Sequence, residues 1–343
     1  MISSTPIEFG TDSTPRYVGL WILVSMLIAL IVLTQVLGES QDWENYSGIF
    51  DAIRADGMQA EAVERLEVGF VWVSKLLIDL SFSNLEVYAI FAAASVALKC
   101  AAINRFSSGA VAFFLAIIFH LVCFAPLHEL TQLRAAVSIA LLFYSYALLM
   151  SGRVFSAVFF AAVAVVFHLS AVVLYPLFFM VYLCQKGVFA PTRAKAVCLG
   201  LGTYVFASLL VASLIAYFGD FLLIAAAYQD LGFGEAAVNP FSPFVLLNLG
   251  VVASGLVLWP ALTPNMRYII IFQLAGAAVF FATPGFQVVA FRIYELLQSF
   301  LVFFVADGVR SRDLLIRLLT VGFTITSIAA YSYIYFFSGG FFL

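Results

Sequence analysis

The sequence predicts an all-α polytopic integral membrane protein with about 10–11 transmembrane helices. First, 64% of its 343 residues are hydrophobic and 10% are charged, whereas soluble domains are about 45–50% apolar and about 25% charged. Second, the mean hydropathy is +1.09. Third, apolar runs close to the roughly 20 residues of a spanning helix recur along the chain. These observations exclude a soluble enzyme, a disordered chain, a coiled coil and a secreted disulfide scaffold.

The first part of the chain is predicted to contain one long and one short apolar helix. The first span covers Tyr17–Leu37, and no small-residue cleavage site follows it, which indicates a retained helix rather than a signal peptide. Residues 38–67 form a polar, acidic loop. Residues 68–82 include Lys75 and Asp79. At about 15 residues this segment is short for a span, so we expect a re-entrant or interfacial helix.

The rest of the chain is predicted to continue as spans of one membrane domain, residues 1–343. Apolar runs that each suit one helix are Leu85–Ile103, Ala110–Ala125, Leu130–Met150, Ala196–Phe218, Phe244–Leu262, Tyr268–Phe281, Phe286–Ala306 and Leu314–Phe336. The run Val154–Tyr182 is too long for one helix, and His168 and Ser170 interrupt it. We therefore expect two short helices that meet near His168.

The basic residues predict the orientation, because short cytoplasmic loops are enriched in Lys and Arg. One set of loops contains Arg16, Arg105, Arg153, Lys186, Arg193, Lys195, Arg267, Arg310, Arg312 and Arg317. The opposite loops contain only Arg54 and Arg65. The first set is therefore assigned to the cytoplasm, and the loop 38–67, the turn 126–129 and a second loop at 219–243 face outward. If residues 68–82 crossed the membrane, the N-terminus would lie outside instead.

The densest group of candidate functional residues lies at the predicted outer start of a helix. His128, Glu129 and Gln132 are expected on one face of that helix, within about 100° of one another. A His–Glu pair can abstract a proton, and Arg134, about 9 Å deeper in the membrane, can hold a phosphate or pyrophosphate. In the alternative interpretation, Glu129 only stabilises the helix start and Arg134 pairs with a carboxylate.

A later helix carries a second group, because Arg292 is followed by Tyr294 and Glu295. Arg292 either shares an anion site with Arg134 or simply pairs with Glu295 at i,i+3. His168 is either an outward functional group or a core residue. His120, in the middle of an apolar run, is better explained as structural.

The acidic loop supplies further candidates, Asp42, Tyr46 and Glu67. Carboxylates next to aromatic rings are typical of sugar binding, because hydroxyls donate to the carboxylates and the sugar faces stack on the rings. Exposed acids can also be merely solvated. We find no motif for a metal site, a nucleotide phosphate or a serine nucleophile, so neither a metal nor a cofactor is expected. The net charge of −3 gives no indication of a nucleic acid partner.

The order of these features resembles the EpsG/Wzy-type family of bacterial polysaccharide polymerases. The residues that carry the resemblance are Asp42-x3-Tyr46, Glu67-Val-Gly69, Gln132-Leu-Arg134-Ala-Ala136, Phe167-His168-x-Ser170-Ala171 and Arg292-Ile293. The resemblance implies an enzyme of the bacterial inner (cytoplasmic) membrane with a GT-C-like helical fold and an active site that faces the periplasm. It implies metal-independent transfer of a growing glycan onto the next undecaprenyl-pyrophosphate-linked repeat unit.

Under this resemblance, the candidate residues take distinct roles. Arg134 and Arg292 are expected to bind the pyrophosphate, and the base is expected to be His128, Glu129 or His168. The residues expected to position the sugars are Asp42, Tyr46, Glu67, Gln132, Tyr294 and Glu295. Expected partners are the lipid-linked glycan, membrane lipids and a protein that regulates chain length. A glycan ligase or another membrane transferase stays open as an alternative. A transporter or flippase is less favoured, because such proteins contain inverted repeats and none is visible here.

Overall fold

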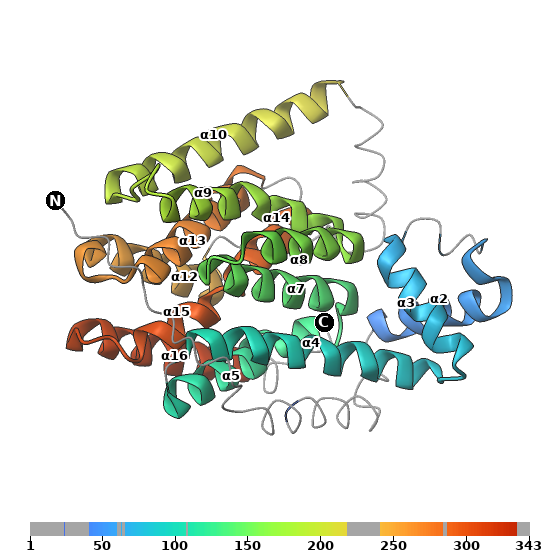
Figure 1. Cartoon of the computed structure of the whole chain (residues 1–343). Coiled ribbons are helices and arrows are strands. Elements are labelled where there is room, and N and C mark those ends of the chain that lie inside the picture. The colour runs from blue at the N-terminus through green and yellow to red at the C-terminus, as the bar shows by residue number, and fades with distance from the viewer. Residues whose placement is uncertain are drawn as a thin grey trace. The chain divides into compact units, whose positions relative to one another are not determined.

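The computed structural model describes residues 24, 41–59, 63, 66–107, 109–217, 241–283 and 287–334. Within these ranges every regular element is a helix (Figure 1). The predicted span Tyr17–Leu37, apart from Val24, and the predicted loop 219–243, apart from residues 241–243, lie outside the described residues.

Two compact units make up the chain, with a boundary between Ala171 and Val172. The helices of the first unit are α2 (Gln41–Asp56), α3 (Val68–Asp79), α4 (Asn84–Phe106), α5 (Ala110–Cys123), α6 (Ala125–His128), α7 (Leu133–Met150) and α8 (Val154–Phe167). A short 3₁₀ turn, η1 (Gly57–Gln59), follows α2. Whether the two units act as one membrane domain stays a prediction.

Helix α7 forms the core of the first unit and is buried on nearly all sides. It lies between α4 and α8 (Figure 1). Ser138 Oγ donates to the carbonyl of Ala164 at 3.0 Å, and Ser145 Oγ donates to the carbonyl of Ala157 at 2.7 Å. Each pair of residue numbers adds to the same value, as expected for two antiparallel helices in one register. Small residues and hydroxyls are typical of helix contacts in membranes, where they allow close approach.

The predicted interruption at His168 is confirmed. Helix α8 ends at Phe167, and His168 has extended backbone angles of φ −161° and ψ 116°. The chain continues as a 3₁₀ helix, η3 (Leu169–Leu174), and then as α9 (Tyr175–Gln185). The polar side chain in this apolar run therefore marks a true helix end.

The loop predicted at 38–67 contains helix α2, which the sequence analysis did not anticipate. The segment after it does form a short helix, α3, of 12 residues. Helix α4 begins with a capping box, in which Ser83 accepts from the backbone of Glu86 and the Glu86 carboxylate accepts from the backbone of Ser83. A re-entrant or interfacial position of α3 stays a prediction.

The second unit is built around α13 (Pro264–Ala282). Its other elements are α9, α10 (Arg193–Tyr217), α12 (Pro243–Val257), η5 (Trp259–Ala261), α14 (Gln287–Gln298), α15 (Leu301–Gly308) and α16 (Leu314–Ser332). The single helix predicted over Phe286–Ala306 is wrong, because α14 ends at Gln298 and α15 begins at Leu301. Ser299 Oγ donates to the Leu296 carbonyl at this break, at 2.7 Å.

Five of the described helices are long and apolar enough to cross a membrane: Asn84–Phe106, Leu133–Met150, Arg193–Leu210, Pro264–Ala282 and Leu314–Ser332. Four further apolar helices are shorter: Ala110–Cys123, Val154–Phe167, Leu169–Gln185 and Pro243–Val257. The fold is therefore that of an all-α polytopic membrane protein, as predicted. The likeness to GT-C folds and the total number of spans stay predictions.

Candidate functional site

Glu67 joins two other candidate residues that are far apart in the sequence. Its Oε2 accepts a hydrogen bond from Arg134 Nη1 at 2.5 Å, and its Oε1 lies 2.8 Å from His168 Nδ1. The exposed fraction of the side chain is 18% for Glu67, 28% for Arg134 and 21% for His168. We call Glu67, Arg134 and His168 the charged triad. The triad lies entirely within the first unit, and its members are partly open to the exterior.

Helix ends bring the triad together. Glu67 is the residue that precedes α3, Arg134 is in the first turn of α7, and His168 follows the last residue of α8. Gly69 permits the close approach of α3 to α8, because a Cβ atom there would lie 2.9 Å from the carbonyl oxygen of Val166. Helix ends also have backbone N–H and C=O groups without partners inside the helix, and such groups can bind polar parts of a ligand near the triad.

Tyr46 of α2 fixes the start of α7 from the other side. Its hydroxyl oxygen accepts from the backbone N–H of Arg134 at 3.3 Å. The ring is 7% exposed and contacts the rings of Phe70 and Tyr88 edge-on, each at 5.6 Å between centroids. Burial raises the pKa of Tyr46, although the charge of Arg134 opposes this rise. Tyr46 is thus a neutral hydrogen-bonding group beside the triad.

The partners of Glu67 stabilise its ionised form. Burial raises the pKa of this carboxyl group, but the hydrogen bond with His168 and the positive charge of Arg134 lower it more, to about 2. An ionised Glu67 accepts hydrogen bonds at both oxygens. In a neutral His168 the proton is therefore on Nδ1, and Nε2 is left as an acceptor.

This arrangement combines two chemical abilities. Arg134 carries a permanent positive charge with several N–H donors, and its Nε has no hydrogen-bond partner although it is buried. Such a group can bind a phosphate oxygen. His168 Nε2 can accept a proton, since Glu67 orients the ring and stabilises the imidazolium that forms, as the carboxylate does in a catalytic triad. The site is therefore suited to binding an anion and removing a proton.

His128, Glu129 and Gln132 do not share one helical face, contrary to the prediction. Helix α6 ends at His128, α7 begins only at Leu133, and Gln132 has non-helical angles of φ −97° and ψ 64°. The break between them rotates Gln132 away from the direction that a continuous helix would give. Gln132 is half-buried and immediately precedes α7.

Glu129 lies in a buried polar cluster that excludes solvent. Its Oε1 accepts from Lys99 Nζ and, at 2.9 Å, from Ser95 Oγ, and its Oε2 lies 3.5 Å from His120 Nε2. Lys99 and Glu129 are both 0% exposed. His128 is 1% exposed, and its ring is stacked on Phe124. Neither His128 nor Glu129 belongs to the partly open triad.

Sequence analysis missed Lys99 and Ser95. The available signal was a single lysine in the apolar run Leu85–Ile103, where a charge is costly and needs a partner. Asp42 was identified from the sequence and is half-buried on α2, one turn before Tyr46. The Asp42 charge contributes to the raised pKa of Tyr46, after the effects of burial and of Arg134.

In the second unit, Arg292, Tyr294 and Glu295 lie on α14. Tyr294 is 2% exposed and belongs to a hydrophobic cluster with Val245 and Phe280. Arg292 and Glu295 are not among the ion pairs within 4.0 Å in the described part of the chain. A pyrophosphate site shared by Arg134 and Arg292 therefore stays a prediction.

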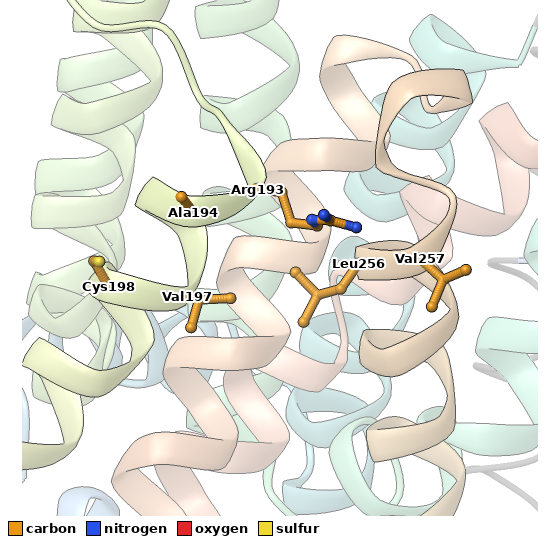
Figure 2. A pocket seen from close by; sticks show the side chains of 6 residues that line it. All are labelled: Arg193, Ala194, Val197, Cys198, Leu256 and Val257. Carbon is orange, nitrogen blue, oxygen red and sulfur yellow. The ribbon is translucent and has the colours of Figure 1, made fainter.

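A surface hollow lies between α10 and α12 (Figure 2). It measures about 420 Å³ and is lined by Arg193, Ala194, Val197, Cys198, Leu256 and Val257. Apart from Arg193 and the thiol of Cys198, its lining is aliphatic, so it lacks the paired polar groups of the triad. Among the described residues, no group of three or more His, Cys, Asp or Glu side chains is arranged to hold a metal ion.

Comparison with known proteins identifies the family. The model of the EpsG family matches residues 18–343, which include the whole triad and Tyr46. No curated protein and no solved structure gives a significant match. The family match covers nearly the entire chain and agrees with the resemblance seen in the sequence motifs. The chain belongs to the EpsG family, the family of Wzy/EpsG-type polysaccharide polymerases.

Proposed function

We propose that this protein polymerises undecaprenyl-pyrophosphate-linked oligosaccharide repeat units at the periplasmic side of the bacterial inner membrane. The growing glycan is transferred from its lipid carrier to the next lipid-linked unit. The observation that carries this proposal is the bridging of His168 and Arg134 by Glu67. A base and a cation held by one carboxylate are what a transfer from a sugar diphosphate requires. Membership of the EpsG family supports the same reaction class.

In the proposed reaction, a hydroxyl of the acceptor unit attacks the anomeric carbon of the growing chain. A new C–O bond forms there, and the bond from that carbon to the diphosphate oxygen breaks. The hydroxyl proton passes to Nε2 of His168, and the polyprenyl diphosphate leaves with the electron pair of the broken bond. One displacement of this kind inverts the anomeric configuration. No metal or cofactor takes part.

Arg134 is proposed to neutralise the leaving diphosphate. Negative charge grows on the leaving oxygens as the bond breaks, and a fixed cation there stabilises the transition state more than the ground state. Loss of one such donor costs about 10²–10³ in rate. Arg292 is retained as a second candidate for this role. Glu67 acts by holding Arg134 and orienting His168.

The sugars are proposed to bind at the start of α2. Asp42 is half-buried there, and Trp43 stands edge-on to Tyr88 with 5.5 Å between ring centroids. A carboxylate and aromatic faces are the groups that sugar hydroxyls and rings bind. Gln132 is the last residue of the break that precedes α7, and Tyr294 and Glu295 remain candidates from the second unit. A protein that regulates chain length is a proposed partner.

The test uses a deletion strain complemented with wild type, Arg134→Ala, Arg134→Lys or His168→Ala. The measurement is the banding pattern of the surface polysaccharide together with the protein level in membranes. We expect a ladder with wild type and collapse to a single repeat unit with Arg134→Ala and His168→Ala. Arg134→Lys should give a short ladder, because lysine keeps the charge but not the planar fork that binds phosphate.

Arg105→Ala is the matched control. Arg105 lies at the other end of the first unit, where it donates to the Tyr144 hydroxyl at 3.1 Å, so its ladder should equal that of wild type. A full ladder from Arg134→Ala or His168→Ala would refute the assigned roles. Loss of even the single repeat unit from the deletion strain would instead indicate a ligase or a flippase.

A further inference from the structure

The buried cluster around Glu129 is not used by the proposed reaction. Lys99 and Ser95 of α4 both donate to its Oε1, and the two charged side chains are fully buried. Burying two charges costs several kcal/mol per ion even after relaxation. Replacement by apolar side chains of similar size is often neutral or stabilising. Stability alone is therefore a weak reason for this ion pair.

The cluster instead connects α4 to both sides of the break before α7. Glu129 lies immediately after α6. Ser95 Oγ donates to the Glu129 carboxylate and also lies 2.9 Å from the carbonyl oxygen of Ala136, in the first turn of α7. One hydroxyl thus contacts both Glu129, the first residue of the break at 129–132, and the helix that follows the break.

A third residue of α4 holds the middle of the same break. Tyr88 Oη donates to the carbonyl of Thr131 at 3.3 Å. Tyr88, Ser95 and Lys99 are spaced by 7 and 4 positions, which places them on one face of α4. This face contacts the break at Glu129 and Thr131 and the first turn of α7 at Ala136. The break ends at Gln132, and Arg134 lies only two residues further along the chain.

We propose that α4 clamps the break, with Ser95 and Lys99 bound to Glu129 and Tyr88 bound to Thr131, and that this clamp sets the position of Arg134. Glu129 and Lys99 are positioning residues in this proposal, and Glu129 is not the base. The backbone N–H of Arg134 donates to the Tyr46 hydroxyl, and its side chain pairs with Glu67, while the clamp fixes the segment that leads into α7 from α4. The inference rests on the proposed function in that Arg134 binds the diphosphate.

The test is a double-mutant cycle with Lys99→Met, Glu129→Leu and the two together in the purified full-length protein. Thermal unfolding, the affinity for inorganic pyrophosphate and the KM for the lipid-linked repeat unit are measured for each. Single variants should unfold at lower temperature, because each leaves one buried charge unpaired. The double variant should regain stability. Its pyrophosphate Kd and its KM should nevertheless stay raised by roughly 10- to 100-fold, as for a displaced binding group.

A purely structural pair would behave differently. If the double variant recovered pyrophosphate affinity and KM together with stability, the clamp would be refuted. Adding Arg134→Ala to the double variant should cause little further loss of affinity, since coupled residues are not additive. If Arg134→Ala alone left pyrophosphate binding unchanged, the diphosphate role itself would fail. If Arg134→Ala lost pyrophosphate binding but the double variant bound pyrophosphate like wild type, the clamp would be refuted and the diphosphate role of Arg134 would stand.

A second variant decides the question if the double variant does not fold. Ser95→Ala removes the hydroxyl that contacts both Glu129 and the Ala136 carbonyl without leaving a buried charge unpaired, so it should fold. We expect a several-fold rise in its pyrophosphate Kd and KM. Ser107→Ala is the matched control, because Ser107 Oγ donates to the Ile103 carbonyl at the far end of the same helix. Equal values for the two serine variants would overturn the proposal.

Discussion

At the scale of single residues, the two oxygens of Glu67 bind two different groups of the proposed reaction. Oε1 faces His168 and Oε2 faces Arg134. A change at Glu67 therefore affects both the base and the cation, whereas a change at either partner leaves the other ion pair in place. We therefore expect Glu67 variants to lose activity through both partners, although Glu67 itself takes no part in the proposed bond changes.

Glu67→Gln should lower stability in a pH-dependent way. The pKa of Glu67 is about 2 in the folded chain against an ordinary value of 4.5. A carboxyl group with a lowered pKa stabilises the fold above its unfolded pKa, and this contribution is lost as the pH falls toward the folded value. The difference corresponds to about 3 kcal/mol. The stability gap between wild type and variant should thus shrink as the pH falls from about 4.5 toward 2.

Thermal unfolding in detergent from pH 7 to pH 3 measures this gap. Asp79→Asn is the control, because Asp79 forms an exposed i,i+4 pair with Lys75 at 2.9 Å. Exposed pairs of this kind contribute little to stability, so its curve should follow that of wild type. A gap between Glu67→Gln and wild type that did not shrink in acid would contradict the lowered pKa.

The sequence predicted the members of the triad better than their contacts. Arg134 and His168 stood out because polar groups are costly in apolar surroundings, whereas Tyr46 and Glu67 stood out because carboxylates next to aromatic rings are typical of sugar binding. The pairing of Arg134 with Glu67 could not be derived, since 67 residues separate them and the packing of both α3 and α7 on α8 brings them together. Lys99 is a single lysine within the apolar run Leu85–Ile103, and its partner Glu129 lies 30 residues away in the sequence, so their pairing is equally invisible in the sequence.

At the scale of elements, helix breaks were predictable only where the sequence marks them. His168 is a polar residue in an overlong apolar run, so the end of α8 was foreseen. The break before α7 carries no such mark, because Leu130–Leu133 suits a helix as well as a turn. Tertiary hydrogen bonds decide it, among them that from Tyr88 to the Thr131 carbonyl. Local sequence cannot contain that information.

Gly69→Ala should impair the triad through the packing of α3 on α8. The added Cβ would meet the Val166 carbonyl oxygen at 2.9 Å and one of its methyl groups at 2.8 Å. Because a backbone atom cannot rotate away, α3 must shift, and the Glu67–His168 hydrogen bond should lengthen. A displacement of about 1 Å can cost about 10²-fold in rate. We expect a strongly shortened polysaccharide ladder with normal protein level.

Gly48→Ala is the matched control for this prediction. Gly48 lies on α2, and a Cβ atom there would meet nothing within 4 Å. Alanine has a higher helix propensity than glycine, by about 1 kcal/mol, so this variant should be at least as stable as wild type and fully active. Equal ladders from the two glycine variants would show that the α3–α8 approach is not needed for activity.

At the scale of the whole molecule, both ends of α3 lie near groups predicted to face outward. Glu67, before its start, binds Arg134, and the start of α4 after it is tied to α2, with Asn84 Nδ2 at 2.8 Å from Asp51 Oδ1. Twelve residues of helix extend about 18 Å, less than the roughly 30 Å of a bilayer core. These observations support the prediction that α3 does not cross the membrane.

Much of the surface of the described helices is apolar, as expected for contact with lipid. On α10, Leu201 and Phe206 are 62% and 68% exposed, and on α16 Leu314 and Leu318 are each 60% exposed. In a soluble protein such patches would favour aggregation. Composition alone predicted this property of the chain, because the fraction of charged residues is too small to cover a surface in water.

The orientation can be tested with single cysteines in a variant that lacks the four native ones. The exposed positions Asn45 on α2, Ser151 after α7, Val188 after α9 and Phe241 before α12 are suitable. A membrane-impermeant maleimide should label Asn45→Cys and Phe241→Cys in intact spheroplasts. It should label Ser151→Cys and Val188→Cys only after permeabilisation, because the neighbouring Arg153, Lys186 and Arg193 predict a cytoplasmic position for those loops.

The result bears directly on the proposed reaction. Asn45 is one residue from Tyr46, whose hydroxyl contacts the backbone of Arg134, so its label reports the side on which the triad opens. Labelling of Asn45→Cys from outside would support transfer at the periplasmic face, where repeat units must be joined after they have crossed. Labelling only after permeabilisation would put the triad at the cytoplasmic face. Polymerisation of exported units by these residues would then be untenable, whatever the ladder of the Arg134 variants.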